Sequence, residues 1–95
     1  MKYNSKCNKN EIFERIVRIA QEMLLAFREQ GMQKLPEIKL ETDIFKDLGI
    51  DSVEVMDLIG LIEKEFGVSI EPEKVATKRI FADIVGYVDE LLQKS

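Results

Sequence analysis

The sequence predicts an all-α fold, a bundle of three main helices and one short helix with a long first loop. Three segments of the 95-residue chain repeat apolar residues at intervals of three and four, which is typical of amphipathic helices. No segment alternates apolar and polar residues well enough to predict a strand. A chain of this length builds one core, so we expect a single domain over residues 10–95 after a flexible tail over residues 1–9.

The first helix is expected within residues 10–31, with a length of about 20 residues. Asn8 or Asn10 can cap its start, and Gly31 suits a left-handed stop. Its apolar stripe consists of Ile12, Phe13, Ile16, Val17, Ala20, Met23, Leu24 and Phe27.

The connection over residues 31–51 is long for a segment without structure of its own in a compact domain. Within it, residues 42–49 are expected to form a short helical turn capped by Thr42 or Asp43. Because apolar residues are spread along the connection, we expect it to pack on the helices. These residues are Leu35, Ile38, Leu40, Ile44, Phe45 and Leu48.

The second helix is predicted from Ser52 to Phe66, with Gly67 as its stop. Placed at about 100° per residue, its side chains form two faces. The core face consists of Val55, Leu58, Ile59, Ile62 and Phe66. A second face, here called the mixed face, adjoins Ser52 and consists of Val53, Met56, Asp57, Gly60, Glu63 and Lys64.

The mixed face has two interpretations. An apolar and acidic surface beside a helix start is typical of a docking surface. Alternatively, the long loop covers Val53 and Met56, and Gly60 lets a neighbouring segment approach. Glycine inside a helix costs about 1 kcal/mol against alanine, and Gly60 can also widen a groove along the helix.

Two further helices complete the predicted bundle. A short third element begins near Pro72, because proline fits the first turn of a helix. The last helix is expected over residues 80–92. Its buried stripe consists of Ile80, Phe81, Ile84, Val85, Val88, Leu91 and Leu92.

The composition excludes several kinds of chemistry. The chain has no histidine, which removes Ser-His-Asp and Cys-His catalysis and most zinc sites, so neither an autonomous hydrolase nor a metal site is expected. The one cysteine, Cys7, cannot form an internal disulfide. No apolar run reaches the roughly 18 residues of a membrane span, and the polar start is unlike a secretory signal, so we expect a cytoplasmic protein.

Charge is distributed unevenly along the chain. Residues 1–40 hold eight basic and five acidic side chains, a balance of +3, whereas residues 41–95 hold six and thirteen, a balance of −7. The acidic part would repel nucleic acid. It would steer a partner that has a basic patch toward the chain.

Ser52 stands where the second helix starts, and it suits two roles. Unmodified, it is a good N-cap. A phosphate ester on its hydroxyl would lie beside the unpaired N–H groups and the partial positive charge of the first turn. The position alone favours the cap.

The segment DLGIDSVEVMDLIGLIEKEFGVSI resembles the Asp-Ser-Leu motif region of acyl carrier proteins, and the resemblance extends over about residues 11–92. It implies an acyl-carrier-like four-helix bundle in which Ser52 bears a 4′-phosphopantetheine arm derived from coenzyme A. The thiol of the arm carries acyl groups as thioesters. Asp51 is then the acidic residue next to the serine, and partner proteins recognise it. The implied recognition face consists of Val53, Met56, Asp57, Gly60 and Glu63.

The resemblance also implies partners. A phosphopantetheinyl transferase would install the arm, and acyl-loading, ketosynthase or other acyl-processing enzymes with basic docking patches would bind the monomeric carrier. These partners belong to fatty-acid, polyketide or related biosynthesis. The chain departs from the family pattern at Val53, Gly60, Lys64, Lys78 and Arg79, which suggests a specialised carrier for polyketide or modified-lipid synthesis.

Three other functions stay open at this point. The chain could be a carrier-derived helical adaptor that binds partners without the arm, or an aminoacyl carrier. A calcium-binding module is suggested by Asp43, Asp47 and Asp51. Their spacing of four does not match the alternation of two in an EF-hand loop.

Overall fold

The computed structural model describes residues 8–28 and 37–94, and it confirms the all-α expectation. In chain order the helices are α1 (Lys9–Arg28), α2 (Ser52–Phe66), α3 (Pro72–Ala76) and α4 (Phe81–Lys94). Within the described ranges the sole β-type pairing is an isolated antiparallel bridge between Asp43 and Ile80. The expected stop at Gly31, the packing of Leu35, Cys7 and most of the tail lie outside the described residues.

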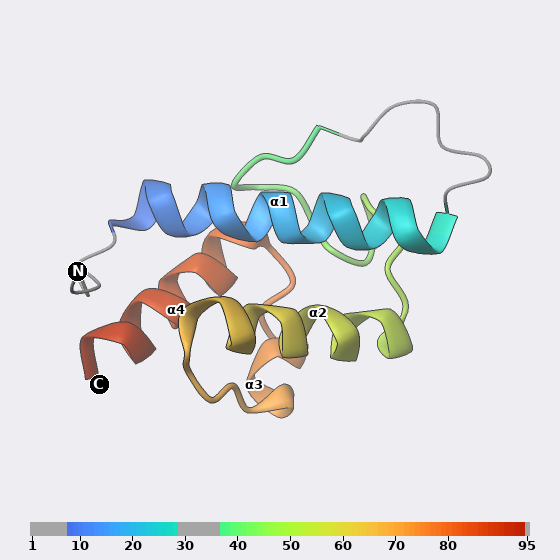
Figure 1. The fold of residues 1–95 in the computed structure, drawn as a ribbon. Coiled ribbons are helices and arrows are strands. Elements are labelled where there is room, and N and C mark those ends of the chain that lie inside the picture. Colours follow the sequence, from blue (N-terminus) through green and yellow to red (C-terminus); the bar gives the residue numbers. More distant parts are fainter. Residues whose placement is uncertain (1–7, 29–36, 95) are drawn as a thin grey trace.

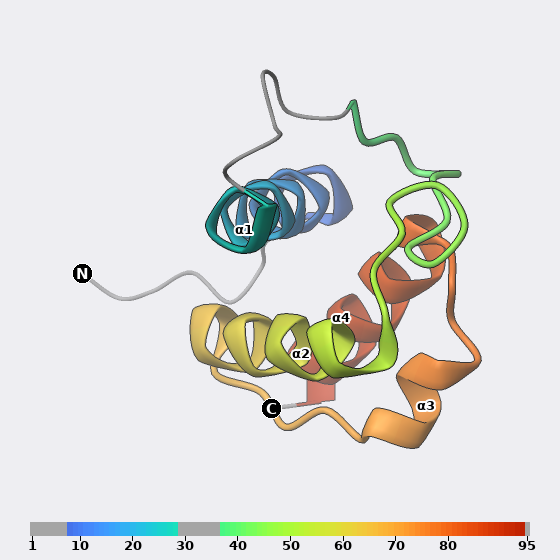
Figure 2. The same ribbon diagram turned by 90° about the vertical axis from the view of Figure 1, so that its right-hand side faces the viewer.

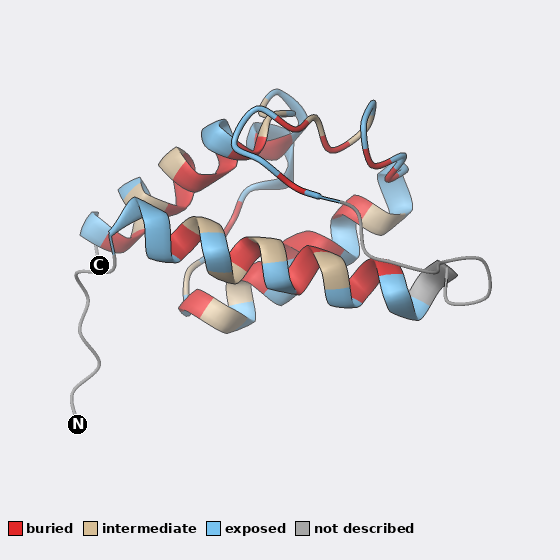
Figure 3. Ribbon diagram, turned by 90° about the horizontal axis from the view of Figure 1, so that it is seen from above, coloured by how far each residue is buried: buried red, intermediate tan, exposed pale blue. Residues whose placement is uncertain are grey.

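The three long helices surround one core. Helices α1 and α2 run antiparallel, so the start of α2 lies near the end of α1 (Figures 1 and 2). Helix α4 runs obliquely to both, from close to α1 at its start to about the level of α2 at its end, and the short α3 lies at the side of the bundle (Figures 1 and 2). Buried residues line the inward sides of all the long helices (Figure 3).

Most of the predicted core is buried as expected. The core face of α2 consists of the five residues that its periodicity indicated, and the apolar stripe of α1 is buried or half-buried over the residues whose side chains are described. The last helix differs slightly from the prediction. It starts at Phe81 because Ile80 forms the bridge to Asp43, and it extends to Lys94. Its buried side also includes Tyr87.

The caps explain where α1 and α2 begin and end. Asn8 caps α1, because its Oδ1 accepts a hydrogen bond from the backbone N–H of Glu11 at 2.8 Å. Gly67 ends α2 in the left-handed conformation, with φ of 68°, and its N–H donates to the carbonyl of Glu63 at 2.8 Å.

The first loop packs on the bundle, as predicted, except at Leu40, which is 45% exposed. Ile38, Ile44 and Leu48 are buried. Asp43, one of the two expected caps, closes the helical turn within residues 42–49. Its Oδ1 accepts from the backbone N–H groups of Phe45 and Lys46, both at 2.8 Å.

Candidate functional site

Asp51 caps helix α2. Its Oδ1 accepts from the backbone N–H of Glu54 at 2.8 Å, and Glu54 Oε1 accepts from the backbone N–H of Asp51 at 3.1 Å, which together form a capping box. The suggestion that Ser52 is the cap is therefore wrong. Because aspartate followed three residues later by glutamate satisfies two donors reciprocally, the N-cap is the residue before the serine, and Ser52 is the first residue of the helix.

Ser52 is left exposed as the first residue of α2. Its hydroxyl forms no hydrogen bond with any other described residue. It lies in the turn where helical N–H groups have no intrahelical partner and the helix dipole is positive. A hydroxyl without a hydrogen-bond partner can form an ester with a phosphate group at this position. The first-turn N–H groups could then donate hydrogen bonds to the phosphate.

The loop before Ser52 is fastened to the connection between α3 and α4. The backbone N–H of Ile44 donates to the carbonyl of Arg79 at 2.9 Å, and that of Phe81 donates to the carbonyl of Thr42 at 3.1 Å. Arg79 Nε also pairs with Asp43 Oδ2 at 3.4 Å, and its guanidinium lies 5.6 Å from the centre of the Phe45 ring. These contacts fix the position from which α2 starts.

The backbone hydrogen bond from Lys46 holds the pKa of Asp43 below its ordinary value of 3.8. A second backbone hydrogen bond, from Phe45, and the positive charges of Arg79 and Lys46 act in the same direction, whereas partial desolvation opposes them. Because the carboxylate is favoured in the folded state, it stabilises the fold above its unfolded pKa. That stabilisation is lost as the pH falls through the folded pKa.

We expect Asp43→Asn to destabilise the protein at pH 7 and to have little effect in acid. The amide oxygen can still accept the two backbone hydrogen bonds, but the charge that faces Arg79 is lost. Urea unfolding of both proteins at pH 7 and at about pH 3 measures the difference. Glu73→Gln, at an exposed carboxylate of α3, is the control. If the difference in free energy of unfolding between the Asp43 variant and the unmodified protein were equal at both pH values, the charge of Asp43 would not stabilise the fold.

A small apolar pocket opens beside Ser52, between α2 and α3. It has a volume of about 210 Å³ and is lined mainly by apolar side chains, with Ser52 at its polar edge. Val55 and Ile59 form its α2 side, and Pro72 and Val75 form its α3 side. We call it the Ser52 pocket. An apolar chain attached near the serine would find a matching surface there.

The described part of the loop, residues 37–51, leaves the mixed face of α2 uncovered. Val53 is 72% exposed and Met56 is 51% exposed, and Asp57 is exposed beside them. Among the described residues, no atom lies within 4 Å of the position that a Cβ on Gly60 would take, apart from its two chain neighbours and the local helix backbone. The interpretation in which Gly60 admits a close neighbour is therefore wrong, and the apolar and acidic residues beside Ser52 face solvent.

Glu63 differs from the rest of the mixed face. It is half-buried, and its Oε2 accepts from the backbone N–H of Ile70 at 2.7 Å. At the residue after Ile70, the backbone N–H of Glu71 donates to the hydroxyl of Tyr87 in α4 at 3.2 Å. Both side chains therefore hold the segment that leads into α3, and sequence periodicity gave no sign of either bond.

Two negative findings concern the parts of the chain that the structure describes. No group of three or more Cys, Asp or Glu residues there could hold a metal ion. Asp43 and Asp47, suggested above as calcium ligands, instead interact with each other, since the N–H of Asp43 donates to Asp47 Oδ2 at 2.8 Å. None of the described helices is long and apolar enough to cross a membrane.

Comparison with known proteins gives a consistent family match. Residues 14–88 match the family described as "Phosphopantetheine attachment site". The acyl carrier protein of Rickettsia bellii is 30% identical over 80 residues, which is 84% of this chain and 93% of the relative. That of Trieres chinensis is 32% identical over 80 residues, or 84% and 91% of the two chains. That of Campylobacter jejuni subsp. jejuni is 44% identical over 55 residues, or 57% and 70%.

Proposed function

The chain belongs to the acyl carrier protein family, and from this membership we propose that it carries acyl intermediates as thioesters on a 4′-phosphopantetheine arm attached to Ser52. Proteins of this family are carriers, and their partners supply the catalysis. The observation that supports Ser52 most is its free, exposed hydroxyl at the first residue of α2, next to the apolar Ser52 pocket. We propose the same carrier role, without catalysis, for this chain.

The residues around Ser52 suit such an arm. The hydroxyl would hold its phosphate as an ester, where first-turn N–H groups favour an anion. When bound, the group supplies a thiol at the end of a flexible chain. Asp51 contributes by fixing the start of α2 through the capping box, and its exposed carboxylate adds negative charge that a partner can read. The Ser52 pocket offers an apolar surface for the part of an acyl chain nearest the thioester.

Docking partners are proposed from the exposed part of the mixed face. Val53 and Met56 offer apolar contact area, and Asp57 adds a negative charge on the same side. A phosphopantetheinyl transferase and acyl-loading, ketosynthase or other acyl-processing enzymes with basic patches would complement the part of this surface nearest Ser52, which Val53, Met56 and Asp57 form. Glu63 is less available to a partner, because an ion pair with the partner would compete with its hydrogen bond to Ile70.

The proposed function is tested by loading the purified protein. Incubation with coenzyme A, magnesium and a phosphopantetheinyl transferase of broad specificity should add the mass of one phosphopantetheine group, measured by intact-protein mass spectrometry. Tandem mass spectrometry of a digest should then locate the group on Ser52. A protein that keeps its original mass, while a known carrier in the same mixture is loaded, would contradict the proposal and favour the adaptor function. The mass of the native loaded protein would identify the cargo, and with it the fatty-acid, polyketide or modified-lipid pathway.

A further inference from the structure

A second hollow lies on the other side of α2, between α2 and the later part of α1. It has a volume of about 530 Å³ and is lined by Met23, Met56, Asp57, Gly60, Leu61 and Lys64. We call it the Gly60 groove. It shares Met56 with the Ser52 pocket but opens separately toward α1.

Internal packing does not explain the glycine in this groove. Glycine is less favourable than alanine inside a helix, and Gly60 lies in the middle of α2. It lacks a positive φ, and in the part of the chain that the structure describes a Cβ built on it would meet nothing within 4 Å beyond its chain neighbours and the local helix backbone. An alanine would therefore fit at this position among the described residues. What the missing side chain does provide is open space above the helix, in the hollow that Met56 and Leu61 also line.

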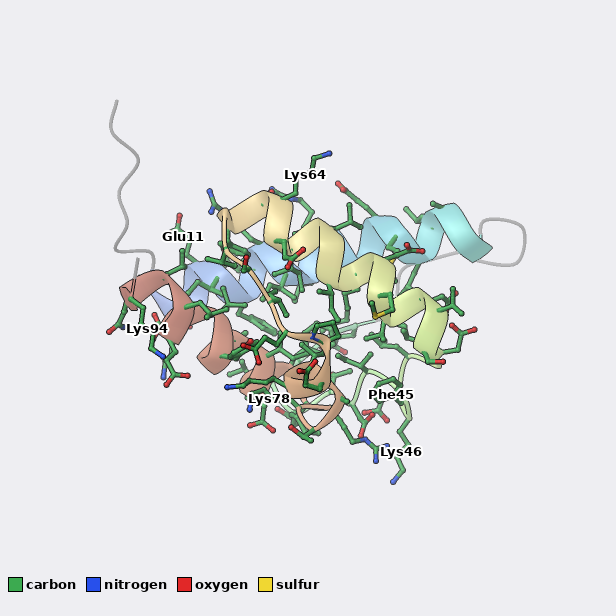
Figure 4. All side chains as sticks on the ribbon, turned by 90° about the horizontal axis from the view of Figure 1, so that it is seen from below. Glu11, Phe45, Lys46, Lys64, Lys78 and Lys94 are labelled. Atoms are coloured by element: carbon green, nitrogen blue, oxygen red, sulfur yellow. The ribbon has the colours of Figure 1, made fainter. Side chains whose placement is uncertain are left out.

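The charges beside this space are arranged on one side of α2. Asp57, Gly60 and Lys64 occupy positions i, i+3 and i+7, so the two charged residues are about 10 Å apart along the axis with the glycine between them. Both are exposed, and neither has an ion-pair partner among residues 8–28 and 37–94. Figure 4 shows Lys64 extending away from the bundle.

The apolar lining completes the pattern. Met56 is 51% exposed and Leu61 is 41% exposed, whereas Met23 of α1 is buried at the base. An apolar floor between one negative and one positive charge is complementary to a surface with an apolar anchor between one basic and one acidic residue. A uniformly basic surface would match Asp57 but would be repelled by Lys64.

We infer that the Gly60 groove docks an α-helix of a protein partner, which inserts one large apolar side chain above Gly60. The anchor is flanked by a basic residue that faces Asp57 and an acidic residue that faces Lys64, about one turn to either side. This inference rests on the proposed carrier function, which requires partner proteins, and it adds the kind of surface that one of them presents. The partner is selected by both charge signs, because two exposed unpaired charges of opposite sign border the anchor site.

A synthetic helix provides the probe. We would use an alanine-rich 16-residue peptide, acetylated and amidated, with a central Phe, an Arg three residues before it and a Glu four residues after it, so that all three share one face. Titration into the loaded protein, followed by amide NMR, should give saturable shifts at Met23 and over residues 56–64. Two comparison peptides replace the Phe by Ala or the Glu by Lys, and each should bind about tenfold more weakly.

Two protein variants separate the groove from general surface effects. Gly60→Met fills the space and should weaken peptide binding about tenfold, without lowering the thermal midpoint, because methionine is the better helix former. Ala82→Met adds the same side chain at an exposed position on α4 and should leave binding unchanged. Lys64→Glu should reverse the preference between the peptide with Glu and the peptide with Lys.

The possible results distinguish this inference from the carrier function. Saturable shifts at the groove, with binding that Gly60→Met weakens about tenfold, support it. Absent shifts, shifts elsewhere on the bundle, or equal binding of all three peptides overturn it. In each case the loading of Ser52 is measured on the same samples. A protein that is loaded but does not bind the peptide is a carrier without this docking groove, whereas a protein that is not loaded contradicts the carrier function itself.

Discussion

Replacing Ser52 with alanine should abolish the gain of phosphopantetheine and leave the protein folded. The loss of loading should be complete, because the arm would have no hydroxyl oxygen to attach to at this position. The fold should be unaffected because Ser52 is exposed and its side chain has no hydrogen-bond partner among the described residues. The cap of α2 is the neighbouring Asp51, so the substitution leaves the capping box intact.

Two control variants make the Ser52 result specific. Ser69→Ala, at an exposed serine after α2, should be loaded like the unmodified protein. Asp51→Ala should lower the free energy of unfolding by about 1 kcal/mol, because it removes the N-cap side chain. Intact mass and urea unfolding are measured on all three variants. Equal loading of Ser52→Ala would show that the arm is attached elsewhere, and a loss of stability as large as that of Asp51→Ala would show that the serine contributes to the cap.

The features that sequence predicts best in this protein are those that local rules determine. The helical period of α2 separates a core face from an exposed face, and the five core residues are the ones that are buried. Gly67 adopts the left-handed conformation that a helix stop requires, and Pro72 is the first residue of α3. Each of these depends on a residue and its near neighbours in the chain, which is why the sequence alone was sufficient.

The cap of α2 shows a limit of the same local rules. Aspartate and serine are both good N-caps, and they are adjacent here, so propensity alone could not choose between Asp51 and Ser52. The choice is made by Glu54, which stands three residues after Asp51 and completes the capping box. That spacing was present in the sequence, and it would have left Ser52 uncommitted from the start.

Other features depend on contacts between distant segments. Glu63 bonds to Ile70 and Tyr87 bonds to Glu71, seven and sixteen residues apart, and neither pair follows a helical or strand period. The Gly60 groove needs Met23, which comes from another helix. Periodicity placed Gly60 on an exposed face, but only the packing of α1 against α2 shows what lies beside it.

Phe81→Ala should cause the largest loss of stability among these predictions, about 3–5 kcal/mol, which is the usual cost of truncating a buried phenylalanine. Phe81 is fully buried, with 0% of its surface exposed, at the first residue of α4. Its ring packs edge-on against Phe13 of α1, with the ring centres 6.5 Å apart. The same residue donates its backbone N–H to Thr42 in the loop that leads to Ser52.

The effect should therefore extend from the core to the proposed attachment site at Ser52. A cavity at Phe81 loosens the start of α4, to which the first loop is hydrogen-bonded at Thr42, and next to it at Arg79. Urea unfolding measures the stability, and amide hydrogen exchange should show faster exchange over residues 42–50 than in the unmodified protein. Val53→Ala, at a side chain that is 72% exposed, should change stability by less than about 0.5 kcal/mol. If Phe81→Ala costs no more than Val53→Ala, then Phe81 does not anchor the core or the loop that positions Ser52.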